Sequence, residues 1–298
     1  MLKVSIIVPT YNREERLCDT LMSLQKIDYQ DFEVIVVDQT KHHKRETEDF
    51  LKKLKNKIKY FKLEKPHYTK ALNAGAEMAT GDILLFIDDD VEILTKDFIK
   101  YHVRNYADKS IGGVCGCILH QNEEKPLPYR GEKFTWIKPF FNRDKKMEIE
   151  VAPCANFSVR KEVFESAGKF DEKFEAGGFL HEIDFCFRLK KLGFKIIYEP
   201  KAILRHFYGT EGGAQNKLRL SAGIESFKYF VYFFQNVIYF LLKHFKGFSF
   251  LKYLWHYLRE YWLNRPLFMR GGFFFLFHRG YSFILGFLRA VKKYRLTY

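Results

Sequence analysis

The chain has 298 residues, 47% of them hydrophobic, which excludes an intrinsically disordered protein. Its net charge of +14 is uneven: residues 216–298 hold 14 Lys or Arg, 2 Asp or Glu and 26 aromatic residues, so a near-neutral region precedes a basic, aromatic one. The five cysteines form no CxxC pair, which argues against a disulfide framework or a structural zinc site. No signal-peptide pattern precedes the first predicted strand, and we therefore expect a cytoplasmic protein.

The first 90 residues alternate apolar segments with helical ones. Strands that are apolar on both faces and separated by helices indicate a parallel sheet with right-handed crossovers. No GxGxxG follows the first strand and no GxxxxGK[ST] occurs. The sequence therefore lacks the main motifs that would indicate a dinucleotide-dependent oxidoreductase or a P-loop protein. We predict strands at 4–9, 32–37, 58–63 and 82–87, and helices at 14–24, 41–57 and 70–79.

The next 125 or so residues are more irregular. A long polar loop at 121–150 contains three prolines and is a candidate functional segment. Pro200 follows the last strand that we predict in this region. We predict strands at 111–119 and 195–198, a short strand or turn at 155–160, and helices at 161–167 and 182–192.

Three consecutive carboxylates, Asp88, Asp89 and Asp90, follow the most apolar of the predicted strands. Adjacent acids repel one another unless a cation lies among them, and hard oxygen ligands suit Mg²⁺ or Mn²⁺. A divalent ion that bridges to a phosphate is one interpretation. The other is a solvated, Asp-rich turn that caps the next helix.

Two further sites follow from local pattern. The turn after the first strand contains Thr10 and Asn12, either of which would cap the next helix, and helix N-termini receive anions. In the helix at 182–192, Glu182 and Asp184 are about 200° apart and cannot face the same site. Asp184 pairs with Arg188 at i,i+4, so we favour Glu182 as the chemical group over a simple first-turn acid.

Seven motifs in order resemble family 2 glycosyltransferases of the GT-A fold over residues 3–213. The resemblance implies a Rossmann-like, mixed, mostly parallel sheet flanked by helices in a domain at 1–215, with a nucleotide half at 1–90 and an acceptor half at 91–215. The charge and aromatic content of residues 216–298 add a C-terminal amphipathic helical extension. The motifs are PTYNR at 9–13, VVD at 36–38, ALNAG at 71–75, FIDDD at 86–90, NFSVR at 156–160, GKFDE at 168–172 and EIDFCFR at 182–188.

The same resemblance implies roles for individual residues. Glu182 would be the catalytic base, and a divalent metal, Mg²⁺ or Mn²⁺, would be held by Asp90, Asp88 and His206. Two alternatives from the residues alone stay open: His206 as a surface or packed histidine, and Asp38 as a strand-end turn former. The nucleotide-sugar site would comprise Pro9, Thr10, Tyr11, Asn12, Asp38, Lys70, Asn73, Asp88 and Asp89.

Two departures from the family pattern are visible. Glu-Asp is common where this chain has His181-Glu182, so the base would be Glu. Processive members carry QxxRW, whereas Gln215 is followed by Arg219 one position late and by no tryptophan. We therefore expect transfer of a single sugar, and one carboxylate base with direct displacement predicts inversion of the anomeric centre.

The C-terminal region predicts three helices, at 227–245, 248–263 and 273–293. On a helical wheel, Lys228, Gln235, Asn236, Lys243 and Lys246 share one arc of about 100°. The apolar part of the first helix is too short for a bilayer core. Basic, aromatic amphipathic helices suit the surface of an anionic membrane. The alternative is a helical subdomain packed on the catalytic core or on a second chain.

The sequence thus predicts a cytoplasmic, metal-dependent glycosyltransferase, peripheral on the inner face of the membrane. Its partners would be a nucleotide-diphosphate sugar and a glycan or lipid-linked acceptor. One alternative is a non-catalytic nucleotide-sugar-binding scaffold. Another is a nucleic-acid binder, but no recognised motif supports it and we expect no nucleic-acid partner.

Overall fold

The computed structural model describes residues 1–208, 224–261 and 265–297. These residues form two compact units. The first, the α/β unit, contains residues 1–171 and 182–208, and the second, the helical unit, contains residues 172–181 together with the described residues from 224 onward. The Gln215 to Arg219 stretch and the predicted boundary after residue 215 lie outside the described residues.

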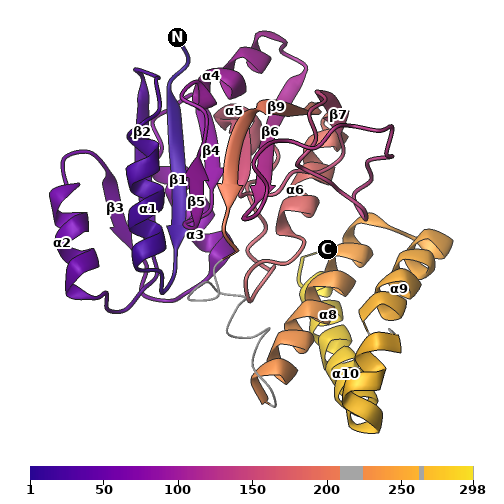
Figure 1. Ribbon diagram of the computed structural model, residues 1–298. Helices are drawn as coiled ribbons and strands as arrows, with labels where there is room; N and C mark the ends of the chain where they lie inside the picture. Colours follow the sequence, from indigo (N-terminus) through magenta and orange to yellow (C-terminus); the bar gives the residue numbers. More distant parts are fainter. Residues whose placement is uncertain (209–223, 262–264, 298) are drawn as a thin grey trace. The chain divides into compact units, whose positions relative to one another are not determined.

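A mixed sheet of nine strands forms the α/β unit (Figure 1). The order is β3-β2-β1-β4-β8-β6-β9-β5, and β7 pairs with β9. The first four of these strands are parallel, and β6 is parallel to β9, whereas β8 runs antiparallel to its neighbours β4 and β6. The strands are β1 Val4–Thr10, β2 Phe32–Asp38, β3 Lys59–Lys62, β4 Ile83–Ile87, β5 Val91–Ile93, β6 Ile111–His120, β7 Met147–Ile149, β8 Asn156–Arg160 and β9 Lys195–His206.

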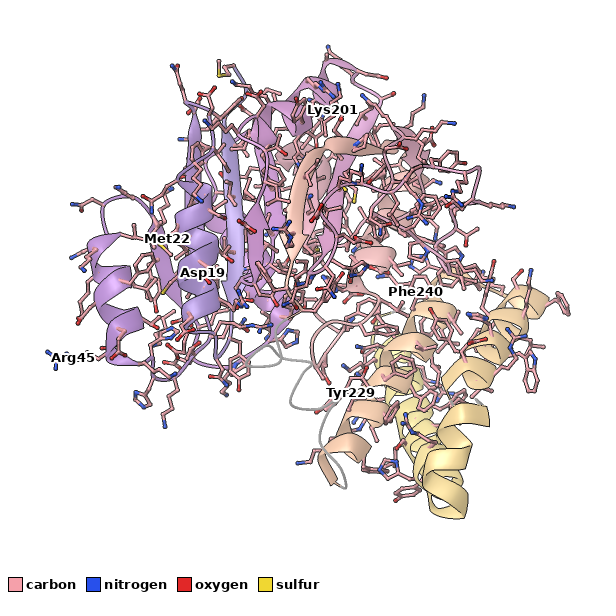
Figure 2. All side chains as sticks on the ribbon, in the orientation of Figure 1. Asp19, Met22, Arg45, Lys201, Tyr229 and Phe240 are labelled. Carbon is pink, nitrogen blue, oxygen red and sulfur yellow. The ribbon has the colours of Figure 1, made fainter. Side chains whose placement is uncertain are left out.

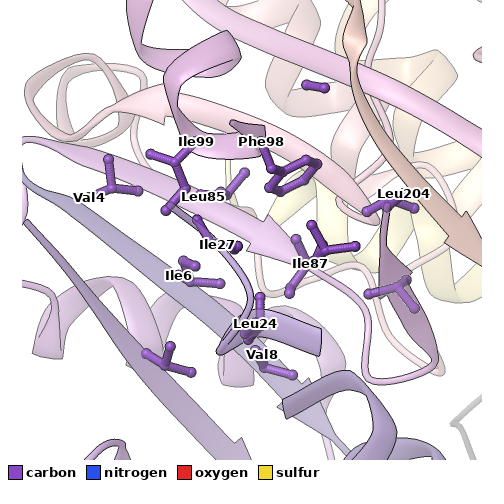
Figure 3. Packing of buried hydrophobic residues seen from close by; sticks show 14 of the residues in the cluster. Val4, Ile6, Val8, Leu24, Ile27, Leu85, Ile87, Phe98, Ile99 and Leu204 are labelled. Carbon is purple, nitrogen blue, oxygen red and sulfur yellow. The ribbon is translucent and has the colours of Figure 1, made fainter. Parts of the chain in front are cut away.

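Helices cover both faces of this sheet. Successive side chains of a strand point to opposite faces, so Val4, Ile6 and Val8 of β1 share a core with α1 and α4 (Figure 3). Ile7 points to the other face, where α3 packs so closely that a Cβ on Gly75 would lie 2.5 Å from Ile7 Cγ2. The helices are α1 Glu15–Leu24, α2 Arg45–Lys53, α3 Tyr68–Met78, α4 Phe98–Val103, the 3₁₀ turn Arg104–Ala107, α5 Lys161–Ser166 and α6 His181–Lys191.

The predicted mixed, mostly parallel α/β architecture is confirmed. The helix predicted at 41–57 forms only over the bounds of α2, and it is exposed, with Arg45 extending into solvent (Figure 2). The prediction that Thr10 or Asn12 caps α1 is wrong. Thr10 is the last residue of β1, Asn12 has a left-handed φ of 52°, and no side chain caps the helix.

The predicted end of a strand at Tyr198 is also wrong. β9 continues through Pro200 to His206, because the ladder with β6 contains a bulge at this point. Gly116 pairs with Glu199 and the next residue, Cys117, pairs with Ile203, so Pro200 needs no ladder hydrogen bond. The extension carries His206 to the same sheet edge as the carboxyl ends of β1 and β4.

The helical unit contains α8 Ile224–His244, α9 Gly247–Tyr261 and α10 Arg265–Arg295. Pro266 does not interrupt α10, because it lies in the first turn, where a missing N–H is tolerated. The polar arc predicted for α8 is exposed only in part: Lys228 and Lys246 are exposed, whereas Gln235 and Asn236 are each 1% exposed. Within the described parts of the chain, no helix is both long and apolar enough to cross a membrane.

Candidate active site

Four strands deliver polar side chains to one edge of the sheet. β1, β2, β4 and β9 are parallel, and their carboxyl ends lead to Asn12, Asp38, Asp88 and His206, respectively. Open α/β sheets bind ligands at this edge, and the turn between β4 and β5 places the three consecutive carboxylates there. The adjoining loops are connected, because the Asn12 N–H donates to Thr40 Oγ1 at 2.8 Å.

Asp88, Asp90 and His206 form a group that could hold a metal ion. One ligand atom from each lies within 4.8 Å of the others. His206 Nε2 is 2.9 Å from Asp90 Oδ1 and 3.5 Å from Asp88 Oδ2. Two carboxylates and an imidazole suit Mg²⁺, Mn²⁺ or a similar divalent ion, so the residues fit the implied cofactor.

The electrostatics of this group also fit a cation. Burial raises the pKa of Asp88 and Asp89, and the charge of Asp90 raises both further. Burial alone would lower the pKa of His206, but its hydrogen bond to Asp90 and the charge of Asp88 raise the pKa overall. Like charges held this close are costly unless a positive charge lies beside them.

Arg13 and Tyr68 join this group, although the sequence did not single them out as site residues. Arg13 Nη2 lies 2.9 Å from Asp90 Oδ2, and its Nε lies 3.4 Å from Asp89 Oδ1. The Tyr68 hydroxyl donates to Asp88 Oδ1 at 3.0 Å. Arg13 belongs to the first motif of the resemblance, so the sequence contained a signal that could have identified it as a site residue. Tyr68 lies in none of the seven motifs, and no sequence pattern around it indicated a role in the site.

Glu182 lies in the first turn of α6, partly exposed. Burial is the main cause that raises the pKa of Tyr68, Asp88 and Cys154, and the charge of Glu182 raises all three further, so Glu182 acts electrostatically on the acidic group. Asp184 is fully buried, and its Oδ2 is 2.9 Å from Arg188 Nη2. The structural pairing predicted for Asp184 and Arg188 is therefore present, and the chemical role of Glu182 stays a prediction.

Asp38 belongs to a second polar group at the end of β2. It is fully buried, and its carboxylate accepts from the Thr40 N–H at 2.8 Å and from the Tyr60 hydroxyl. His43 lies between two acids, with Nε2 3.0 Å from Asp38 Oδ2 and Nδ1 3.2 Å from Glu14 Oε1. No sequence pattern marked His43, Tyr60 or Glu14 as partners of this group, because their pairing depends on the conformation of the loop after β2.

The charges in this second group stabilise one another. Burial would raise the pKa of Asp38, but hydrogen bonds from His43, Tyr60 and Thr40 lower it overall. The hydrogen bond to Asp38 raises the pKa of His43 against the effect of burial, and Glu14 raises it further. Asp38 is thus held as a carboxylate by its neighbours.

The other predicted nucleotide-site residues occupy two places. Pro9 and Thr10 are buried at the end of β1, followed by the half-buried Tyr11 and the exposed Asn12. Lys70 is exposed in the first turn of α3. Asn73 is buried, and its amide donates to the Phe170 carbonyl at 2.9 Å and accepts from the Phe170 N–H at 3.1 Å. This geometry gives Asn73 a structural contact in addition to the predicted nucleotide role.

A family model described as glycosyl transferase family 2 matches residues 5–168, more than half of the chain. The chain belongs to glycosyl transferase family 2. It is therefore a nucleotide-sugar glycosyltransferase with the GT-A fold, as the seven motifs implied. The family model covers the sheet edge with Asp88, Asp89 and Asp90 and ends before α6.

Two curated relatives are named for the transfer of a sugar. The O-antigen chain rhamnosyltransferase RfbN of Salmonella typhimurium is 25% identical over 69% of this chain and 66% of its own length. The glucosyl-dolichyl phosphate glucuronosyltransferase of Haloferax volcanii is 26% identical over 69% of each. The match to the rhamnosyltransferase thus spans just under two thirds of that protein.

Solved structures share the fold. The mannosyltransferase PcManGT of Pyrobaculum calidifontis, in complex with GDP-Man and Mn²⁺, superposes with a TM-score of 0.55 at 16% identity. The superposition covers 94% of this chain and 74% of that one. At this identity the likeness establishes the fold alone.

Proposed function

We propose that the protein transfers a single sugar, with inversion and with the help of a divalent metal, from a nucleotide-diphosphate sugar to an acceptor hydroxyl. The observation that carries the proposal is the convergence of Asp88, Asp90 and His206 at the edge that Glu182 also approaches. A metal-ligand group next to a separate carboxylate is the arrangement that this displacement requires.

The donor half of the chemistry concerns the leaving group. Cleavage of the bond between C1 and the diphosphate builds negative charge on the diphosphate, and a bound divalent ion would stabilise that charge. Asp88, Asp90 and His206 would hold the ion. Arg13 adds a fixed positive charge to the same group, and the loops after β1 and β2 would hold the base and ribose. The mannosyltransferase complex with GDP-Man and Mn²⁺ supports this assignment by analogy.

The acceptor half depends on Glu182. An alcohol is a weak nucleophile at neutral pH, and a positioned carboxylate removes its proton as attack proceeds. One base and direct displacement from the opposite side of C1 would give an inverted product. A double displacement would need a second carboxylate as the nucleophile that forms a covalent intermediate with the sugar. The single displacement proposed here forms no such intermediate.

We further propose that the acceptor is a lipid-linked or surface glycan at an anionic membrane. The relative from Haloferax volcanii is named for a dolichyl phosphate-linked substrate. On α9, Phe248, Leu251 and Trp255 are 81%, 60% and 58% exposed and share one face with the exposed cations Lys252 and Arg259. An exposed apolar stripe flanked by cations matches the headgroup layer of an anionic bilayer.

A donor-consumption assay tests the proposed function. The purified protein is incubated with Mn²⁺ and separate sugar nucleotides, such as UDP-glucose, UDP-N-acetylglucosamine, GDP-mannose and dTDP-rhamnose. Water takes the place of the acceptor hydroxyl in this assay. We expect metal-dependent hydrolysis of one sugar nucleotide to its nucleoside diphosphate and a free sugar, with the inverted anomer formed first, as followed by NMR before mutarotation. Retention of configuration would contradict the single-displacement scheme, and turnover that is unchanged by EDTA would contradict the metal.

A further inference from the structure

Residues 172–181 lead directly into α6 and end next to Glu182, and we call them the approach segment. They are part of the helical unit, whereas Glu182 and the rest of α6 are part of the α/β unit. The chain itself therefore joins the position of Glu182 to whatever fixes the approach segment.

Asn236 of α8 holds the approach segment by its backbone. The Asn236 side-chain Nδ2 donates to the Glu175 carbonyl at 2.9 Å, and its Oδ1 accepts from the Glu175 N–H at 3.4 Å. Asn236 is 1% exposed, so both ends of a buried amide serve a single residue of the segment. Burying an amide without hydrogen-bond partners costs free energy of folding, so the folded state favours the arrangement in which Asn236 binds Glu175.

Other contacts fix the same segment. Lys293 Nζ of α10 donates to the Lys173 carbonyl at 2.9 Å and lies 2.8 Å from Glu175 Oε1. The rings of Phe174 and Tyr239, both fully buried, meet edge to face with centroids 5.3 Å apart. The segment is thus a packed part of the helical unit.

The backbone of the approach segment needs such support. Ala176, Gly177, Gly178 and Leu180 all have left-handed φ values, between 50° and 84°. This conformation is unfavourable for alanine and leucine and persists where the surroundings enforce it. The four residues lie between the anchored Glu175 and Glu182, so the anchors determine how α6 begins.

A matching contact exists in the α/β unit. Asn73 of α3 binds both backbone groups of Phe170 with its side-chain amide, just as Asn236 binds those of Glu175. The stretch between Phe170 and Glu175 is therefore clamped at both ends by the same two-bond pattern. Buried clamps of this kind set the geometry of the chain that follows them.

We propose that Asn236 and Lys293 are positioning residues for sugar transfer: they hold the backbone of the approach segment, and the chain leads from this segment directly into Glu182. This inference rests on the proposed role of Glu182 as the base. It assigns the buried polar residues of α8 a part in turnover, in addition to any membrane role of the helical unit.

The test compares full-length Asn236→Ala and Lys293→Ala with Lys293→Arg and Lys292→Ala. Lys293→Arg keeps the cation, and Lys292→Ala removes an exposed cation from the neighbouring position of α10. Three quantities are measured: hydrogen exchange of residues 175–184, binding of the nucleoside diphosphate with Mn²⁺, and kcat for release of that diphosphate from the sugar nucleotide. We expect faster exchange in the two disrupting variants, kcat lower by about tenfold or more, and diphosphate binding within about twofold of wild type. The two controls should behave like wild type.

Other outcomes overturn the inference in distinguishable ways. If exchange accelerates and kcat is unchanged, the segment does not position the base, although the proposed function stands. If kcat and diphosphate binding fall together, or exchange does not change, the two residues do not act through the segment. If wild-type protein releases no diphosphate from any sugar nucleotide, the proposed function fails, and this inference fails with it.

Discussion

His206 Nε2 lies 2.9 Å from Asp90 Oδ1, although the two residues are 116 positions apart in the chain. The contact exists because β9 runs past its proline to the edge where β4 ends, and Phe207 N–H then donates to the Asp90 carbonyl at 3.0 Å. The β5–β9 ladder, in which Val91 pairs with His206, fixes the register of the two strands. The histidine is therefore presented to the carboxylates by backbone pairing.

The base assignment predicts the behaviour of Glu182→Gln. The amide keeps the size of the side chain but cannot accept the acceptor's proton, so kcat should fall by about 10²–10⁴-fold. Binding of a nucleoside diphosphate with Mn²⁺ should change by less than about twofold, because the donor site is built from other residues. Steady-state kinetics and calorimetry measure the two quantities. Glu162→Gln, in the first turn of the separate helix α5, is the control. Wild-type turnover in Glu182→Gln would exclude the base role.

The His43 bridge predicts a pH-dependent stability. The folded-state pKa of His43 is raised, so its contribution is fully present below the ordinary value of about 6.5 and is lost as pH rises through the raised value. His43→Gln should therefore cost more free energy of unfolding at pH about 6 than at pH about 9. Urea unfolding at both pH values measures this difference. His42→Gln, at the neighbouring exposed position, should show no such difference, and an equal cost of His43→Gln at both pH values would refute the linkage.

Asn156, from the fifth motif of the resemblance, is predicted to act through stability. It is fully buried, its Nδ2 donates to the Cys117 and Ala202 carbonyls at 3.0 and 3.1 Å, and its Oδ1 lies 3.0 Å from His102 Nε2. Asn156→Ala should lower the free energy of unfolding by about 2–4 kcal/mol, because several buried groups lose a partner. Denaturant unfolding measures the loss. A cost below about 0.5 kcal/mol, typical of a surface change, would contradict this role.

The membrane proposal predicts the effect of Trp255→Glu. A carboxylate at the centre of the exposed α9 stripe opposes burial of apolar surface and is repelled by anionic lipid. We expect cosedimentation with phosphatidylglycerol-rich vesicles to fall by about tenfold. Met22→Glu places the same charge on an exposed apolar position of α1, at 45% exposure, and should leave binding unchanged. Equal binding by wild type and Trp255→Glu would remove the stripe from the interface.

The sequence predicted the order of strands and helices well, because hydrophobic periodicity is a local signal. It also predicted which acids lie at a strand end. It placed the end of the strand at Tyr198 too early, since only the partner strand shows the bulge near Pro200. It did not show that Gln235 and Asn236 are buried, since a polar arc has the same pattern whether water or a buried backbone satisfies it. Contacts such as His43 with Glu14 depend on loop conformation and carry no periodic signal.

Calorimetric titration with nucleoside diphosphates, with and without Mn²⁺, tests the central claim most directly. Wild type is compared with Asp90→Ala and with Asp19→Ala, an exposed acid of α1 that serves as the control. The account predicts that one diphosphate binds wild type and Asp19→Ala in a Mn²⁺-dependent manner, and that Asp90→Ala loses at least about tenfold in affinity. Binding that is independent of Mn²⁺, or equally tight in Asp90→Ala, would contradict a donor site organised around the Asp88, Asp90 and His206 group.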